Sequence, residues 1–257
     1  MYPQLFHIYG PFYVQSYGVA ICVGLALLLF GVIHNPLAKR YFSREQLLDV
    51  LSRGILLGVI GGRLLHVLSE PQEYASFWDI FKVWEGGLSS LGVVITVACC
   101  LPWYLYKRNI PVVPTMDLIA MYVPLLAMSI RIGCFLAGCC YGKISQVAWA
   151  IPVYGHGAAG ECLYLHPVQL YSACLLFGLF LLLRYVIAPR VKVPGQLICA
   201  YLACTGFERF FIDFWRADQV IAWGIPVSIH QVIAFSLMCV GILGYLVLAY
   251  RARFVAS

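Results

Sequence analysis

The sequence has 257 residues, of which 62% are hydrophobic and only 11% are charged, and its mean hydropathy is +0.87. Soluble domains carry about 25% charged residues, so this composition excludes an ordinary soluble globule. The formal charge of +6 is not gathered into basic patches interleaved with aromatic residues, which argues against nucleic-acid binding. Residues 1–15 contain no Lys or Arg, so we expect no cleaved signal peptide and a first apolar stretch that stays as a helix.

Several apolar stretches approach the roughly 20 residues that an α-helix needs to cross a bilayer. They cover residues 14–33, 54–69, 88–106, 115–133, 168–187, 194–212 and 229–249. The expected fold is therefore an all-α integral membrane protein with seven transmembrane helices, forming a single domain over residues 1–257.

Basic residues gather after alternate stretches. They follow the first, third, fifth and seventh: Lys39, Arg40, Arg44, Arg53, Lys107, Arg108, Arg184, Arg190, Lys192, Arg251 and Arg253. Residues 70–85, in contrast, contain four acidic residues and Lys82 as their one basic residue. By the positive-inside rule, the N-terminus is expected to be extracytoplasmic and the C-terminus cytoplasmic.

Three arginines lie within the predicted spans instead. At about 1.5 Å per residue, Arg63 is roughly 15 Å beyond Arg53, and Arg131 and Arg209 are about 20–24 Å from the inner ends of their helices. All three are therefore expected between the midplane and the outer boundary of the membrane. A guanidinium at such depth costs at least about 2.5–3.5 kcal/mol on insertion scales and usually faces a protein interior or a watery cavity.

Two interpretations of these arginines are open. They pair with helix carbonyls or with Glu208 and Asp213, or reach the interface along their side chains; alternatively, they bind an anion. Three arginines on separate helices at similar depth favour an anion, and the guanidinium fork matches two oxygens of a phosphate. A phospholipid head group is the anion that reaches such a site from the bilayer, so the sequence predicts a phospholipid pocket.

Residues 131–142 read RIGCFLAGCCYG, and Gly133 and Gly142 permit close approach of the backbone to a neighbouring helix or to a head group. This segment resembles the signature of the prolipoprotein diacylglyceryl transferases, Gly-Arg-x-Gly-Asn-Phe-x-x-x-Glu-x-x-Gly. The resemblance extends over nearly the whole chain, in order. Its other parts are residues 8–11 (IYGP), 16–18 (SYG), 62–64 (GRL), 84–89 (WEGGLS), 166–171 (HPVQLY) and 206–216 (GFERFFIDFWR).

The resemblance implies a multi-pass enzyme of the bacterial inner membrane, with its site on the extracytoplasmic side. Such an enzyme transfers a diacylglyceryl group from phosphatidylglycerol to the lipobox cysteine of a prolipoprotein, forming a thioether and releasing glycerol 1-phosphate. It implies that Arg131, Arg209 and Tyr17 are catalytic, with the two arginines holding the phosphate, and it implies no cofactor. The remaining candidates are substrate-binding residues or residues of an outer gate: Arg63, Gly133, Gly142, Ser89, His166, Asp213 and Arg216.

The histidine that the family favours as a general base aligns with Leu91. Leucine cannot accept a proton, so another group or water does this work, or the activity is altered or lost. Candidate replacements are Ser89, Ser90 and His166. His166 also suits a purely structural hydrogen bond at the start of its helix.

Cysteines replace the asparagine and the glutamate of the signature, at Cys134 and Cys139, and Thr205 replaces a motif tyrosine. With Cys140 and Cys162, four cysteines fall in or beside one outer loop. We expect a disulfide such as Cys139–Cys162 in an oxidising compartment. No Cys-x-x-Cys or paired-histidine spacing indicates a metal site, so no metal is predicted. A cysteine that carries an acyl group is a further alternative.

Two other classes of function are open. A divergent relative would modify another thiol or amine with a lipid, or would bind phospholipid without transferring it. An anion transporter would also place arginines at membrane depth. Transport would be favoured by discontinuous helices in symmetric halves, and the sequence contains no such pattern.

Overall fold

The structure is a computed structural model that describes residues 4–9, 12–74, 76–83, 86–154, 162–217, 219 and 227–255. Four residues of the motifs quoted above lie outside these ranges: Gly10, Pro11, Trp84 and Glu85. The chain forms two compact units. The larger contains Met1–Val32 and Asp117–Ser257, and the smaller contains Ile33–Met116. The single domain over residues 1–257 stays a prediction.

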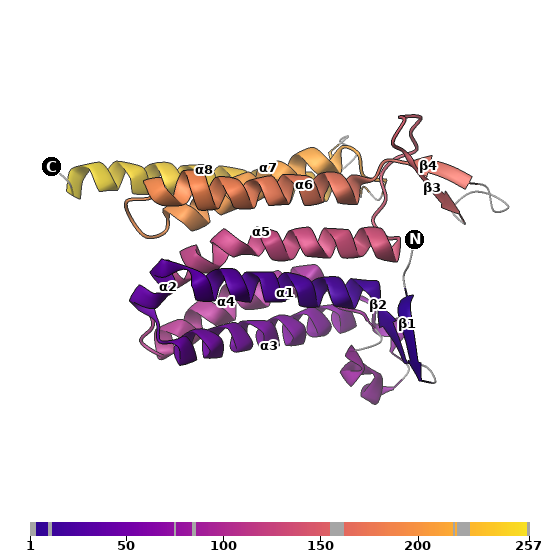
Figure 1. Cartoon of the computed structure of the whole chain (residues 1–257), viewed down its shortest axis with the longest axis horizontal. Coiled ribbons are helices and arrows are strands. Elements are labelled where there is room, and N and C mark those ends of the chain that lie inside the picture. Colours follow the sequence, from indigo (N-terminus) through magenta and orange to yellow (C-terminus); the bar gives the residue numbers. More distant parts are fainter. Residues whose placement is uncertain are drawn as a thin grey trace. The chain divides into compact units, whose positions relative to one another are not determined.

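Within the described ranges, six helices are long and apolar enough to cross a membrane (Figure 1). They are α1 (Ser16–His34), α3 (Arg44–Ser69), α4 (Ser90–Lys107), α5 (Val112–Ala137), α6 (Val168–Leu181) with its π-helical and 3-10 continuations η5 (Leu182–Ile187) and η6 (Ala188–Arg190), and α8 (Ile229–Val255). This confirms a mainly helical membrane protein.

The predicted sixth stretch also forms a helix, α7 (Gln196–Asp213). It contains three charged residues, Glu208, Arg209 and Asp213, within 18 residues and is not among the six helices above. The count of seven spans and the orientation of the termini therefore stay predictions.

The largest difference from the predicted boundaries is at α3, which begins at Arg44 instead of residue 54. Ser43 caps its first turn, since Ser43 Oγ accepts a hydrogen bond from Gln46 N (3.2 Å) and Gln46 Oε1 accepts one from Ser43 N (3.0 Å). Such a capping box satisfies the first amides of a helix and sets its start. Arg44 and Arg53 therefore lie on the helix and not in the preceding loop.

Short elements that the sequence did not predict flank the long helices. They are the antiparallel hairpins β1 (Gln4–Tyr9) with β2 (Phe12–Gln15) and β3 (Ile151–Tyr154) with β4 (Cys162–Leu165), the helix α2 (Pro36–Tyr41), and the 3-10 turns η1 (Pro71–Glu73) and η2 (Phe77–Phe81). In Figure 1 the β3–β4 hairpin projects beyond the N-terminal end of α6.

Small residues let α7 and α8 of the larger unit approach closely, and Figure 1 shows these two helices running side by side. A Cβ atom at Gly206 of α7 would lie 2.5 Å from Ala234 O of α8. A Cβ atom at Gly241 of α8 would collide with Ala203 N of α7. Helices in lipid associate through such close packing because the lipid tails are as apolar as the side chains.

Glycines also join α3 and α4 of the smaller unit. A Cβ atom at Gly92 of α4 would collide with Gly61 O of α3, and one at Gly62 would lie 2.8 Å from Val93 Cγ2. Gly62 precedes Arg63, so this contact fixes the part of α3 that carries the arginine.

Candidate functional site

The signature segment begins on α5, where Gly133 brings α5 against α1. A Cβ atom at Gly133 would lie 2.7 Å from Ala20 Cβ and 3.3 Å from Tyr17 Cδ2. Of the two roles open to this glycine, close helix packing is therefore the one that its surroundings support. The contact also places Tyr17 within electrostatic reach of Arg131, which lies two residues before Gly133.

Three arginines gather at one end of the larger unit. Arg131 lies six residues before the end of α5, Arg209 lies in the last turns of α7, and Arg216 follows shortly after α7. Arg209 is close enough to interact electrostatically with both Arg131 and Arg216. Since like charges repel and none of these guanidinium groups can lose its proton, the cluster is suited to an anion.

Two buried carboxylates lie beside these arginines, and each accepts a hydrogen bond from a serine. Glu208 accepts from Ser172 Oγ (2.5 Å), and Asp213 accepts from Ser228 Oγ. Both carboxylates also interact electrostatically with Arg209. The acids therefore offset part of the positive charge without removing the arginines from the cluster.

Backbone hydrogen bonds join three of the quoted motifs. Gly142 N donates to His166 O (3.1 Å), and Lys143 N donates to Trp215 O (2.8 Å). Gly142 also forms an antiparallel bridge with Arg216. A Cβ atom at Gly142 would lie 2.6 Å from His166 O, so this glycine allows the strand-like contact. The end of the signature therefore lies between the residues just before α6 and the residues just after α7, and hydrogen bonds join it to both.

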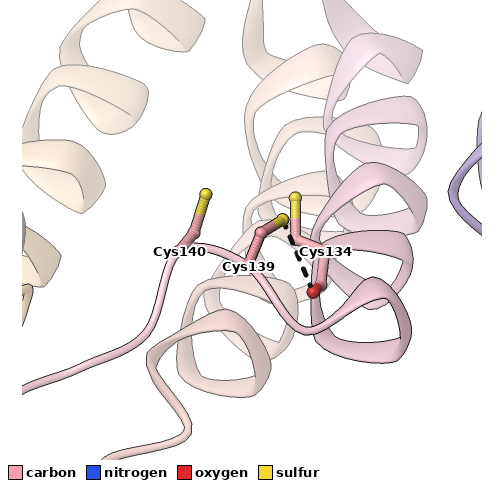
Figure 2. A group of neighbouring side chains, drawn as sticks. All are labelled: Cys134, Cys139 and Cys140. Carbon is pink, nitrogen blue, oxygen red and sulfur yellow. Dashed lines mark hydrogen bonds between the residues drawn. The ribbon is translucent and has the colours of Figure 1, made fainter. Parts of the chain in front are cut away.

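Three cysteines lie between Arg131 and Gly142. The sulfur atoms of Cys134, Cys139 and Cys140 lie within 4.8 Å of one another, and all three residues are free thiols. Figure 2 shows the three sulfurs on the same side of the turn that ends α5. Cys139 Sγ lies 3.7 Å from Cys134 O. This group was not predicted, because the turn that brings the thiols together is not apparent from their spacing in the sequence.

The predicted disulfide between Cys139 and Cys162 is wrong for this structure, in which both residues are free thiols. Cys162 begins β4, and the root of that hairpin is at Leu165, which bridges to Ile144. At about 3.3 Å per strand residue, Cys162 lies roughly 10 Å further along the hairpin. The Cys139 thiol instead faces the end of α5.

The Cys140 thiol has a positive and polar environment. Hydrogen bonds with the thiols of Cys134 and Cys139 lower its pKa, and the charges of Arg216 and Arg131 lower it further. Thiolates are favoured where cations stand nearby. The cysteine group therefore borders the arginine cluster.

Comparison with known proteins decides the family. The family model described as prolipoprotein diacylglyceryl transferase matches residues 3–247. This chain belongs to that family. A phosphatidylglycerol–prolipoprotein diacylglyceryl transferase of Vibrio parahaemolyticus is 32% identical over 253 residues, which cover 94% of this chain and 89% of the relative. One of Clostridium tetani is 30% identical over 219 residues, covering 85% of this chain and 86% of the relative.

Arg63 is buried in the smaller unit of this member of the prolipoprotein diacylglyceryl transferase family. Its guanidinium donates hydrogen bonds to backbone carbonyls. Its partners are Ile80 O (2.8 Å), Gly86 O (2.6 Å), Gly87 O (3.0 Å), Asp79 O (2.6 Å) and Lys82 O (3.3 Å). A guanidinium has five N–H donors, so this set occupies them. Of the two interpretations made from the sequence, carbonyl pairing therefore describes Arg63, and its proposed part in substrate binding lacks a spare donor.

Ser89 and Leu91, two positions where the family's base was sought, stand at the start of α4. Ser89 Oγ accepts from Gly92 N (3.5 Å) as a helix cap, and Ser89 N donates to Gly62 O (3.0 Å). Leu91 is 55% exposed. Ser89 thus has a structural role, and the leucine offers no group that accepts a proton.

His166 contacts aromatic residues. Its Nδ1 lies 3.2 Å from Tyr171 OH, which also accepts a hydrogen bond from Trp149 Nε1 (2.6 Å). This arrangement fits the alternative expectation for His166, a structural hydrogen bond at the start of its helix. Its role in substrate binding stays a proposal.

Proposed function

We propose that this protein transfers a diacylglyceryl group from phosphatidylglycerol to the lipobox cysteine of a prolipoprotein. The family assignment supports this reaction, since the relatives carry it in their names. The single observation that supports the site is the proximity of Arg131, Arg209 and Arg216, which offers a phosphate three permanent positive charges.

The reaction needs these positive charges beside the leaving group, because the leaving phosphate gains negative charge. The cysteine thiol loses its proton to solvent, its sulfur forms a bond to a glycerol carbon of the lipid, and the bond from that carbon to the phosphate oxygen breaks. Its electron pair stays with the phosphate, which leaves as glycerol 1-phosphate. Arg131 and Arg209 stabilise the negative charge that grows on this oxygen, and charge-assisted bonds of this kind are the strong ones.

Tyr17, Asp213 and Arg216 complete the proposed site. Tyr17 lies within electrostatic reach of Arg131, so its hydroxyl is suited to donate to the phosphate or to the attacking sulfur. Asp213 is 1% exposed and is held by Ser228, which fixes the segment leading to Arg216. Arg216 then closes the site beside Gly142 as part of an outer gate.

The proposed location is the bacterial inner membrane, with seven spans and the site on the extracytoplasmic side. Helix lengths and the basic residues between alternate helices support this topology. The charged residues at the end of α7 then lie in the protein interior and not against lipid.

The test is a transfer assay on purified protein with phosphatidylglycerol and a lipobox peptide. Arg131→Ala and Arg209→Ala are each expected to lower kcat by about 10²–10³-fold, the usual effect of removing a group that stabilises transition-state charge. Arg53→Ala, a change at a half-exposed arginine on α3, serves as the matched control and should retain activity. Equal rates for all three variants would contradict the assignment of the arginines.

A further inference from the structure

The cysteine group of the signature, Cys134, Cys139 and Cys140, has the composition of a soft-metal site. We propose that these three thiolates bind one Zn²⁺ ion and leave its fourth position for the thiol of the protein substrate. This inference rests on the proposed function for the identity of that substrate, but the metal site itself does not.

The distances between the three sulfur atoms are close to those in a zinc site. The three sulfurs already lie within 4.8 Å of one another. Zn–S bonds of about 2.3 Å in a tetrahedron place the sulfurs about 3.8 Å apart. Small rotations of three cysteine side chains are enough to reach that geometry.

The backbone is shaped to hold the thiols together. Cys139 N and Gly138 N both donate to Cys134 O, over 3.1 and 3.0 Å, which folds the chain back over the end of α5. Gly138 has a φ of +76° and Cys140 a φ of +61°. The left-handed conformation is unfavourable for a residue with a Cβ, so its occurrence at Cys140 is a feature that some interaction must stabilise.

A buried polar side chain supports the same turn from α6. Gln169 is 3% exposed, and its Nε2 donates to Cys139 O over 2.7 Å. Metal sites commonly rely on such outer contacts to orient their ligands. The turn is therefore braced at its carbonyl as well as at its amides.

A metal ion and a disulfide differ in how many of the three thiols they engage, and a metal ion can bind all three. A disulfide would join two of the sulfurs and leave the third thiol over. Three thiolates with Zn²⁺ carry a net charge of −1, and Arg131 and Arg216 stand within electrostatic reach of Cys140 to balance it. Arg131 precedes Cys134 by three residues, so it lies on the same face of α5.

Thiolate ligands favour Zn²⁺ among the common divalent ions, and a zinc site with three protein ligands and an open position is typical of catalysis. Among the described residues, these three cysteines form the group whose side-chain atoms lie close enough together to hold a metal ion. A substrate thiol that enters the fourth position loses its proton to solvent on coordination. Its sulfur then attacks the glycerol carbon, the bond from that carbon to the phosphate oxygen breaks, and its electron pair leaves with glycerol 1-phosphate, while the zinc keeps its oxidation state. Deprotonation by the metal would explain how the chain works with Leu91 in place of a base.

The first experiment measures metal without activity. The full-length protein is purified in detergent without chelator, its zinc content is measured, and Co²⁺ is titrated into metal-depleted protein to follow the thiolate-to-cobalt absorption band. We expect about one ion per chain and a thiolate band. Cys134→Ser, Cys139→Ser and Cys140→Ser should each weaken binding by more than about 10–100-fold, the cost of losing an outer-shell partner. The matched control Cys162→Ser should bind as the unchanged protein does.

Several results would overturn the proposal. These are zinc far below one ion per chain with no cobalt band, a disulfide among the three cysteines in protein taken directly from membranes, or equal binding by the triple serine variant and the control. Where a variant fails to fold, the unchanged protein is treated with an alkylating reagent with and without Zn²⁺. Protection of the three thiols by Zn²⁺ would support the site, and equal alkylation would overturn it.

A second experiment separates this inference from the proposed function. Removal of zinc should lower transfer to the lipobox peptide, and Zn²⁺ should restore it. Transfer that continues in zinc-free protein would overturn the metal's role and leave the proposed function standing. Zinc binding in a protein that transfers no lipid would instead overturn the proposed function and leave the site.

Discussion

Gln169 Nε2 donates a hydrogen bond to Cys139 O over 2.7 Å, and so links the start of α6 to the turn that follows α5. Gln169→Leu would leave that carbonyl without this donor. The hydrogen bond is part-buried, and a typical hydrogen bond contributes about 0.5–1.5 kcal/mol, so we expect a lower unfolding midpoint in detergent. Gln146→Leu, at an exposed glutamine of the following loop, is the control and should unfold as the unchanged protein does. Identical midpoints for the two variants would show that the link is unimportant.

Gly133 determines how closely α5 approaches α1. Gly133→Ala places a methyl group 2.7 Å from Ala20 Cβ, and overpacking of this kind costs about 1–3 kcal/mol. We expect a lower unfolding midpoint and a lower transfer rate, because Tyr17 moves away from Arg131. Gly18→Ala is the control, since a methyl group there meets no atom within 4 Å. The double variant with Ala20→Gly should recover the stability, and a failure to recover would contradict the packing argument.

Replacement of Arg63 is expected to lower stability, whereas replacement of Arg131 is expected to lower the catalytic rate. Arg63→Ala leaves loop carbonyls such as Gly86 O without their donor, at about 1–3 kcal/mol for each buried group. We therefore expect a lower unfolding midpoint and faster proteolysis of residues 70–88, with KM for phosphatidylglycerol unchanged in the protein that stays folded. Arg131→Ala should lower kcat with little change in the midpoint. A raised KM without loss of stability in Arg63→Ala would return Arg63 to the substrate site.

Asp79 makes the same segment sensitive to acid. Its hydrogen bond with Lys82 Nζ (2.7 Å), and then that with Ser76 N, hold the pKa of Asp79 below its ordinary value. Because the pKa is lower in the folded state, the stabilisation is present above the pKa of the unfolded chain. It is lost as pH falls through the folded value. Proteolysis of residues 70–88 by an acid-active protease should therefore accelerate below about pH 4, and Asp79→Asn should show a flatter profile. The same acceleration in both proteins would contradict this assignment.

The long helices could be predicted because their apolar stretches are long and continuous. Their ends could not, since α3 begins ten residues early through the capping pair Ser43 and Gln46, which hydropathy does not detect. The hairpin β3–β4 was missed for a related reason, because its strands are short and pair within a loop.

The site could be predicted in part. Depth in the membrane selected Arg63 together with Arg131 and Arg209, but it cannot distinguish a guanidinium that binds carbonyls from one that faces a ligand. The contacts of Arg63 make that distinction. The cysteine group depends on the left-handed turn at Gly138 and Cys140, which no spacing rule contains. The helix cap formed by Ser89 and the partner of His166, Tyr171, likewise became visible only in three dimensions.

The most direct test of the proposed function is the mass of a lipobox peptide after incubation with the purified protein and phosphatidylglycerol. We predict a gain of one diacylglyceryl group on the cysteine sulfur, accompanied by an equal amount of glycerol 1-phosphate. An unmodified peptide, or a lipid attached through nitrogen or oxygen, would contradict the proposal.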